Sequence, residues 1–227
     1  MTDAFQDRVL DDLLPAFCDH PDRSWCRDGF QTNWTGVSEL DASDFLRAMD
    51  AGLILHLGRG RYRAPRSLAS EYFFWEGPKK TVPRRLTLWI EPVITVAVLA
   101  RMHFDLGWPK NLIGTQSRNW EFDVTAYRSS DLDNEYVACE VKKSISELDQ
   151  LVGLMQRFAV ENTPTSSISH PKEINAYRKL KGLQVRRAHL FWAVGPDATN
   201  HVFRVKYNDE GIALEVVGLD ALIYPDR

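Results

Sequence analysis

The first apolar positions of the chain recur at the spacing of an α-helix. Phe5, Val9 and Leu13 stand four positions apart within residues 5–17, and polar residues separate them. This pattern predicts an amphipathic helix that covers a core with one face.

A second helix is predicted around Phe45 and Met49. Either Asp41 or Ser43 has the side chain to cap its N-terminus. Gly52 stands where a helix often ends in a left-handed residue. The segment therefore predicts a capped helix of about three turns.

Two short runs, 53–57 and 61–65, flank a Gly-Arg-Gly turn and predict a β-hairpin. A helix followed by an arginine-bearing hairpin is the outline of a winged-helix unit. This region therefore either contacts DNA or has a plain structural role. The stretch 76–85, with two prolines, a glycine and four cations, is interpreted as a linker or exposed crossing segment. It divides the chain into an N-terminal helix and hairpin region, 1–80, and a second part, 81–227.

The second part alternates helical and strand patterns. Its clearest strand is 120–128, in which Trp120, Phe122 and Val124 alternate with polar residues. Ser144 and Glu147 form a capping box that opens a helix. The predicted elements are a helix at 93–104, strands at 112–114, 120–128 and 135–143, a helix from 144, a short helix around 172–180, and strands at 188–194 and 201–207. The order α-β-β-β-α-β-β predicts a mixed α/β sandwich around one sheet.

Composition narrows the class of protein. The chain has 227 residues, of which 44% are hydrophobic and 26% charged, as in ordinary globular domains. It contains no apolar run long enough to span a membrane and no basic start with an apolar core, so we expect a cytoplasmic protein without a membrane partner. Three irregularly spaced cysteines give neither a disulfide framework nor a zinc site.

Charge is unevenly distributed along the chain. The formal net charge is -3, so any binding of nucleic acid must come from local patches. Residues 59–85 hold eight basic against two acidic residues, and residues 172–187 hold six against one. These segments predict either a track for a polyanion or a solvated face. The candidate nucleic-acid-binding residues are Arg59, Arg61, Arg63, Lys79, Lys80, Arg84, Arg85, Lys179 and Lys181.

Candidate chemistry lies on the second and third strands of the second part. Glu140 and Lys142 are two positions apart in an apolar strand, so their side chains point to the same face. The turn between the strands would bring Asp123 close to Glu140. Two neighbouring carboxylates repel each other unless a cation lies between them or one is protonated. Mg²⁺, which binds carboxylates, water and phosphate, fits that role.

These residues resemble the PD-(D/E)XK nuclease superfamily. Asp123 is followed 17 positions later by Glu140-Val141-Lys142, and Trp89-Ile90-Glu91 supplies the additional acid of the preceding helix. The resemblance covers about residues 86–195 and is closest to restriction-type and CRISPR-associated effector nucleases. It implies a restriction-endonuclease-like α-β-β-β-α-β core that follows a small, winged-helix-like N-terminal region.

The resemblance also implies roles for individual residues. Asp123 and Glu140 would bind Mg²⁺ or Mn²⁺, Glu91 would support the metal or its waters, and Lys142 would act on the attacking water. Gln150 falls where some branches carry a catalytic glutamine. The implied activity is a Mg-dependent endonuclease that hydrolyses phosphodiester bonds, with DNA as the expected substrate and a homodimer as one arrangement. The alternatives are a catalytically inactive nuclease-fold module that binds nucleic acid and a protein-assembly module.

Overall fold

The computed structural model describes residues 3–19, 26–67, 69–116, 121–129, 135–160, 168–208 and 211–225. Its main feature is a six-stranded sheet with the strand order β11-β10-β9-β8-β7-β6. The strands are β6 (Ile113–Thr115), β7 (Val124–Tyr127), β8 (Glu135–Val141), β9 (Leu190–Val194), β10 (Asn200–Tyr207) and β11 (Ile212–Val217). Strands β8 and β9 are parallel and the other neighbouring pairs are antiparallel. The expected α/β class is therefore confirmed.

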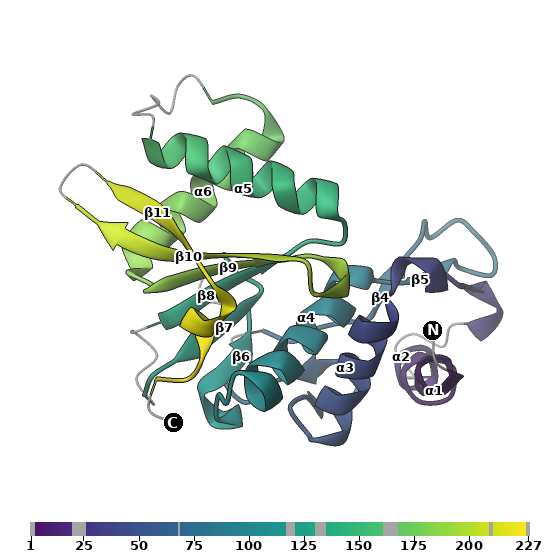
Figure 1. Ribbon diagram of the computed structural model, residues 1–227. Helices are drawn as coiled ribbons and strands as arrows, with labels where there is room; N and C mark the ends of the chain where they lie inside the picture. The colour runs from purple at the N-terminus through teal and green to yellow at the C-terminus, as the bar shows by residue number, and fades with distance from the viewer. Residues whose placement is uncertain are drawn as a thin grey trace.

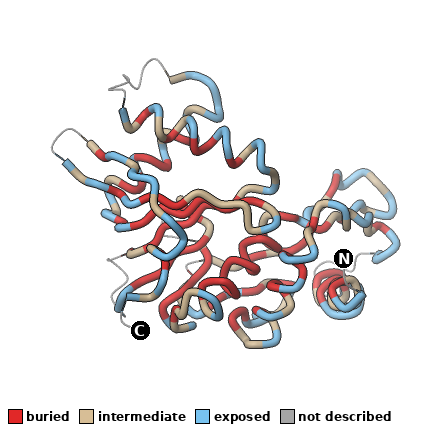
Figure 2. The backbone as a smooth tube through the Cα atoms, viewed as in Figure 1, coloured by how far each residue is buried: buried red, intermediate tan, exposed pale blue. Residues whose placement is uncertain are grey.

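Helices cover both faces of this sheet (Figure 1). Helix α4 (Ile90–Ala100) lies on one face, and α5 (Ile145–Val160) and α6 (Pro171–Arg186) lie on the other. On β8, Cys139 belongs to the core on the α4 side and Ala138 to the core under α5 and α6. The central strands are consequently buried on both faces, as Figure 2 shows. This explains their nearly continuous apolar sequence.

The parallel pair β8 and β9 is joined through α5 and α6. The backbone N–H of Glu147 donates to Ser144 Oγ at 3.2 Å, so the hydroxyl half of the expected cap is present. Helix α6 has 16 residues, more than the short helix expected around 172–180. Its apolar positions, including Ala176, Leu180 and Leu183, are buried although its sequence is strongly basic. The length of α6 therefore follows from the burial of this apolar stripe more than from the basic residues on its surface.

The N-terminal helix predicted over 5–17 is present. It runs through α1 (Asp3–Asp7), a π-helical stretch (Arg8–Leu13) and α2 (Leu14–Cys18). The second predicted helix is α3 (Glu39–Asp50), but its cap is neither Asp41 nor Ser43. Ser38 caps it by accepting the backbone N–H of Asp41 at 3.0 Å. The Asp41 carboxylate is buried and paired elsewhere, as described below.

The arginine-bearing hairpin is also present, with β2 (Leu55–His56) antiparallel to β3 (Tyr62–Arg63). The stretch expected to be a linker is instead the loop between two paired strands, β4 (Phe74–Glu76) and β5 (Leu86–Leu88). Strand β5 also pairs in parallel with β1 (Phe30–Gln31). The loop keeps its expected exposure, but it belongs to a three-stranded sheet that leads directly into α4.

The apolar core crosses from the first part of the chain into the second. Phe5 and Phe45 belong to the same buried cluster as Val93 and Val124. Helix α3 packs closely along α4. The short helical turns are Arg27–Gly29, Trp34–Gly36, Lys110–Leu112, Pro196–Ala198 and Leu219–Leu222, and a π-helical stretch, Arg101–Asp105, extends α4. Across the described ranges, no helix has both the length and the apolar character that crossing a bilayer requires.

Candidate active site

Asp123 and Glu140 lie on neighbouring strands at the end of the hairpin formed by β7 and β8. The Asp123 N–H donates to the Cys139 carbonyl at 2.9 Å, which continues the strand pairing one residue beyond β7. The Asp123 Oδ2 atom accepts the N–H of Val141 at 2.8 Å. The hairpin therefore sets Asp123 beside the end of β8. The turn at 130–134, on which the expectation depended, lies outside the described residues.

Glu140 is almost completely buried, with 2% of its surface exposed. Its Oε1 accepts the Nζ of Lys142 at 2.7 Å, and its Oε2 pairs with the Nζ of Lys179. The Lys142 ammonium also donates to the Val141 carbonyl at 3.0 Å. Each oxygen of the Glu140 carboxylate thus has its own cation, which offsets the cost of burying the charge.

The surroundings of the site shift the pKa values of Asp123 and Lys142. Burial, and next the charge of Glu140, raise the pKa of Asp123 to about 7. Burial acts to lower the pKa of Lys142, but the charges of Glu140 and Asp123 outweigh it and raise that pKa above its ordinary value. Lys142 is consequently a cation at neutral pH, which can donate hydrogen bonds but cannot accept a proton. Asp123 is poised to lose a proton near neutrality.

The Lys142 side chain opens onto a hollow of about 260 Å³ between α4, α5 and α6. Glu91, in the first turn of α4, and Gln150, on α5, line the same hollow. Three of the five predicted catalytic residues therefore meet around one space. Asp123 and Glu140 do not line it and lie behind Lys142. Gln150 accepts a hydrogen bond from Lys172 of α6, which fixes its amide on the far wall.

Lys179 is placed differently from what its sequence neighbourhood indicates. It was grouped with the surface cations, but it is buried, with 9% of its surface exposed. Its ammonium pairs with Glu140 and also donates to the Glu121 carbonyl. The signal that reveals this position is periodicity, because Lys179 is three residues after Ala176 and four before Leu183 on the buried face of α6. Lys179 thus joins α6 to the carboxylate pair.

The other predicted nucleic-acid-binding residues fall on three separate elements. Residues 59–63 belong to the β2–β3 hairpin, residues 79–85 to the β4–β5 loop, and Lys181 to the exposed side of α6. Arg84 is tied down by Glu76 at 2.9 Å, whereas the ammonium of Lys181 lies 5.5 Å from the centre of the Tyr177 ring. The cations of 59–85 and those of α6 are therefore not contiguous in sequence or on one element.

A second buried charged cluster joins α3 to the end of α4, and the sequence patterns did not indicate it. Arg101 donates from Nε to Asp44 at 2.8 Å and from Nη2 to Asp41 at 2.5 Å. Asp41 also accepts the Ser38 hydroxyl at 2.7 Å and the N–H of Asp197 at 2.8 Å. Asp44 also accepts a hydrogen bond from the partly exposed Arg47 at 2.7 Å. Two features of the sequence relate to this cluster. Arg101 comes directly after an apolar helix, and Asp41 and Asp44 are three positions apart on another helix. The pairs hold α3 against the end of α4, so this cluster clamps the fold.

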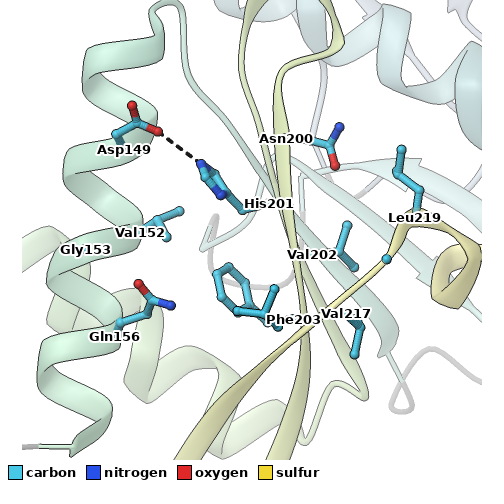
Figure 3. A pocket seen from close by; sticks show the side chains of 12 residues that line it. Asp149, Val152, Gly153, Gln156, Asn200, His201, Val202, Phe203, Val217 and Leu219 are labelled. Carbon is cyan, nitrogen blue, oxygen red and sulfur yellow. Dashed lines mark hydrogen bonds and ion pairs between the residues drawn. The ribbon is translucent and has the colours of Figure 1, made fainter.

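A larger hollow, of about 480 Å³, lies between α5, β10 and β11 (Figure 3). On its rim the Nε2 of His201 lies 3.0 Å from the Oδ1 of Asp149. Val152 and Phe203 form part of its apolar lining. None of the predicted catalytic residues lines it, so it is separate from the hollow at Lys142.

Within the described ranges, no three histidine, cysteine, aspartate or glutamate side chains are close enough to bind a metal ion together. The carboxylate donors at the candidate site are the pair Asp123 and Glu140. A scan against protein-family models, a search of curated proteins and a search of solved structures each find no match to this chain.

Proposed function

We propose that this chain is a metal-dependent nuclease with a restriction-endonuclease-like fold, which hydrolyses phosphodiester bonds of DNA. One observation carries the proposal. Asp123 lies beside Glu140 and pairs with no cation among the described residues, and the adjacent Lys142 opens onto a hollow lined by Glu91 and Gln150. A carboxylate pair, a lysine and an open space are the parts that metal-assisted phosphodiester hydrolysis needs.

The donor set fits Mg²⁺ or Mn²⁺. These ions prefer oxygen ligands, and Mg²⁺ is commonly held by one or two carboxylates, with water and substrate phosphate supplying the remaining positions. Asp123 and Glu140 would hold the ion, and the Val141 carbonyl, which accepts the Lys142 ammonium, is a further oxygen beside them. A pair of carboxylates is therefore sufficient, although no third acidic ligand adjoins it in the described chain. Burial, and next the charge of Glu140, raise the pKa of Asp123, and a bound cation would offset both.

The residues of the chain would divide the work as follows. A bound metal ion would lower the pKa of a coordinated water and neutralise charge on the phosphate. Lys142, which is protonated, would donate to a phosphate oxygen or orient the attacking water, and it would not remove a proton. Glu91 and Gln150 would orient water or substrate from the opposite walls of the hollow.

The alternative is a nuclease-fold module that binds nucleic acid without cutting it. The observation that favours it is the pairing of both Glu140 oxygens with lysines, since Lys142 and Lys179 already balance the charge of the two carboxylates. In that case the cluster would be a complete internal ion pair with no need of a metal. The two functions differ in whether the Asp123 carboxylate is required.

The test is cleavage of plasmid, single-stranded DNA and RNA with Mg²⁺, Mn²⁺ or EDTA. We expect metal-dependent cutting by the wild-type chain and a loss of about 100-fold or more in Asp123→Asn, since even groups that only support metal ligands cost about 10–100-fold. Lys142→Met should lose cutting to a similar extent. The matched control is Lys143→Met, the neighbouring and exposed lysine, which should cut normally.

Measurements of DNA binding distinguish the nuclease from the module that binds nucleic acid without cutting it. Salt-sensitive binding of DNA that is unchanged in Asp123→Asn, with no cutting under any metal condition, would replace the nuclease by the binding module. Cutting that persists in EDTA or in Asp123→Asn would overturn the proposed site.

A further inference from the structure

Two tryptophans are exposed on the small sheet that leads into the candidate site. Trp75, on β4, has 56% of its surface exposed, and Trp89, directly after β5, has 43%. The other strongly exposed aromatic side chain in the described ranges is Phe104, which the Arg47 guanidinium covers at 4.7 Å. Large aromatic rings left open to solvent are unusual and commonly mark a binding surface.

The strand register places both rings on one face of the sheet. Trp75 lies opposite Thr87 in the antiparallel pair of β4 and β5. Trp89 stands two residues beyond Thr87, has an extended backbone, and donates its N–H to the Phe73 carbonyl at 2.8 Å. The pairing therefore continues to Trp89, and strand alternation sets it on the face of Thr87 and Trp75. Diagonal neighbours of this kind are about 7–8 Å apart, close to twice the spacing of stacked bases.

The loop that joins these two strands is positively charged. The β4–β5 loop carries Lys79, Lys80 and Arg85, which are exposed and make no ion pair with any residue in the described ranges. Arg84, by contrast, pairs with Glu76. Open aromatic rings beside unneutralised cations complement a partner that is a polyanion and also presents flat apolar faces. A single strand of nucleic acid has both properties, whereas a duplex keeps its bases stacked inside.

The surface also leads to the candidate active site. Trp89 precedes α4 and lies two residues before Glu91, which lines the hollow shared with Lys142 and Gln150. In Figure 1 the sheet of β4 and β5 passes directly into α4. A strand held on the two tryptophans would therefore run toward that hollow.

We propose that Trp75 and Trp89 stack on unpaired bases, while Lys79, Lys80 and Arg85 hold the phosphates, so that the substrate is a single-stranded or locally unpaired segment of nucleic acid. The inference rests on the proposed nuclease function and deepens it, because it names the form of the substrate. It also assigns to the β4–β5 loop a different task from that of the catalytic cluster.

The test is fluorescence anisotropy of labelled oligo(dT) and of a labelled duplex, measured in EDTA so that cutting does not interfere. Trp75→Ala and Trp89→Ala should each weaken binding of oligo(dT) about tenfold and leave duplex binding unchanged, because base–aromatic stacking is sequence-tolerant and specific to open bases. Trp75→Phe and Trp89→Phe keep a flat ring and should retain most of the affinity. Lys79→Ala combined with Lys80→Ala should reduce the slope of log affinity against log salt by about 1.4, at roughly 0.7 for each phosphate contact.

The controls separate stacking from charge and from misfolding. Both tryptophans are on the surface, so the alanine variants should unfold at the wild-type temperature. If an alanine variant unfolds at a lower temperature, its binding is compared with that of the phenylalanine variant, which keeps the ring. Heparin, a polyanion without bases, should bind the alanine variants as tightly as the wild type.

The failure of this inference is distinguishable from the failure of the proposed function. Unchanged binding of oligo(dT) in both alanine variants, or equal losses for duplex and heparin, would overturn the stacking surface even if plasmid is cut. Tryptophan-dependent binding of oligo(dT) with no cutting under Mg²⁺ or Mn²⁺ would uphold the surface and remove the nuclease.

Discussion

In the part of the chain that the structure describes, two pairs of neighbouring carboxylates are satisfied in different ways. Asp41 and Asp44 share the guanidinium of Arg101, and Asp41 also accepts a hydroxyl and a backbone N–H. Asp123 and Glu140 share no cation, because Lys142 and Lys179 both pair with Glu140. Asp123 accepts the backbone N–H of Val141 instead.

The difference shows how similar residues become a clamp or a candidate site. The guanidinium of Arg101 presents its donors in a fixed fork that spans both carboxylates, and Arg47 adds a second cation at Asp44. Both carboxylates of the first pair are therefore paired and buried. The second pair has a surplus of oxygen ligands next to an open hollow. A further cation would therefore be accommodated at Asp123 and Glu140 but not at Asp41 and Asp44. The predictions below test that contrast.

The largest effect should come from breaking the clamp. Arg101→Met leaves the buried Asp41 carboxylate without a cation and Asp44 with Arg47 alone, which should lower the free energy of unfolding by about 3–5 kcal/mol. Urea denaturation of the wild type and the variant measures this loss. Adding Asp41→Asn to Arg101→Met should recover part of it, since one buried charge is removed. Equal stabilities of wild type and Arg101→Met would show that the cluster is not a clamp.

Metal should bind at Asp123 and Glu140, and not at Asp41 and Asp44, and should thereby stabilise the folded chain. Mg²⁺ at 100 times its dissociation constant should raise the free energy of unfolding by about 2.7 kcal/mol. Asp123→Asn should abolish the gain, and Asp41→Asn, which alters the other pair, should keep it. Urea denaturation across a Mg²⁺ titration provides the measurement. Stabilisation that survives in Asp123→Asn would place the ion elsewhere.

Without metal, stability should depend on pH through Asp123. Its pKa is raised from 3.8 to about 7, so the folded chain keeps a proton that the unfolded chain has lost. The free energy of unfolding therefore falls as the pH rises through that window, because the unfolded state binds fewer protons there.

Other carboxyl groups require a matched comparison in this experiment. Burial also raises the pKa of Glu71 and of Glu135, so they contribute in the same direction. The relevant quantity is the difference between the wild type and Asp123→Asn, measured in EDTA from about pH 4 to about pH 8. Parallel curves for the two proteins would contradict the raised pKa of Asp123.

The smallest effect is expected at the hollow beside β10 and β11. The side chains of His201 and Asp149 are 39% and 58% exposed, so solvent screens the pair and His201→Gln should change the free energy of unfolding by less than about 0.5 kcal/mol. Cutting of DNA should remain at the wild-type rate. A large loss of cutting in this variant would show that the hollow at His201 belongs to the active site, and that the pair at Asp123 does not stand alone.

Local patterns predicted several elements well. The helix over 5–17, the hairpin around Gly-Arg-Gly and the strands of the main sheet follow from short-range periodicity, which a helix or strand must satisfy wherever it packs. Strands β4 and β5 were not predicted, because three residues are too few to show alternation. Strand β11 has six residues, but Glu215 is its only polar position, so it shows no alternation either. The proximity of Asp123 to Glu140 was predictable since a hairpin joins them.

Contacts between distant segments could not be predicted in this way. Lys179 is 39 residues from Glu140, and Arg101 is 57 residues from Asp44. A basic residue in a basic segment gives no indication that its charge will be buried, unless the helical face on which it lies is known. Asp41 was expected to cap a helix because capping is local, whereas its carboxylate is used by a partner on another helix.

The sequence alone determined the α/β class, the position of the main strands and the pairing of Glu140 with Lys142 on one strand face. These depend on period and spacing, which are properties of neighbouring residues. Only the tertiary structure decided that Lys179 serves Glu140, that Arg101 closes the pair Asp41 and Asp44, and that Trp75 and Trp89 share an open face. Those arrangements depend on how helices and sheets pack. The free energy of a buried charge depends on the partner that packing places opposite it.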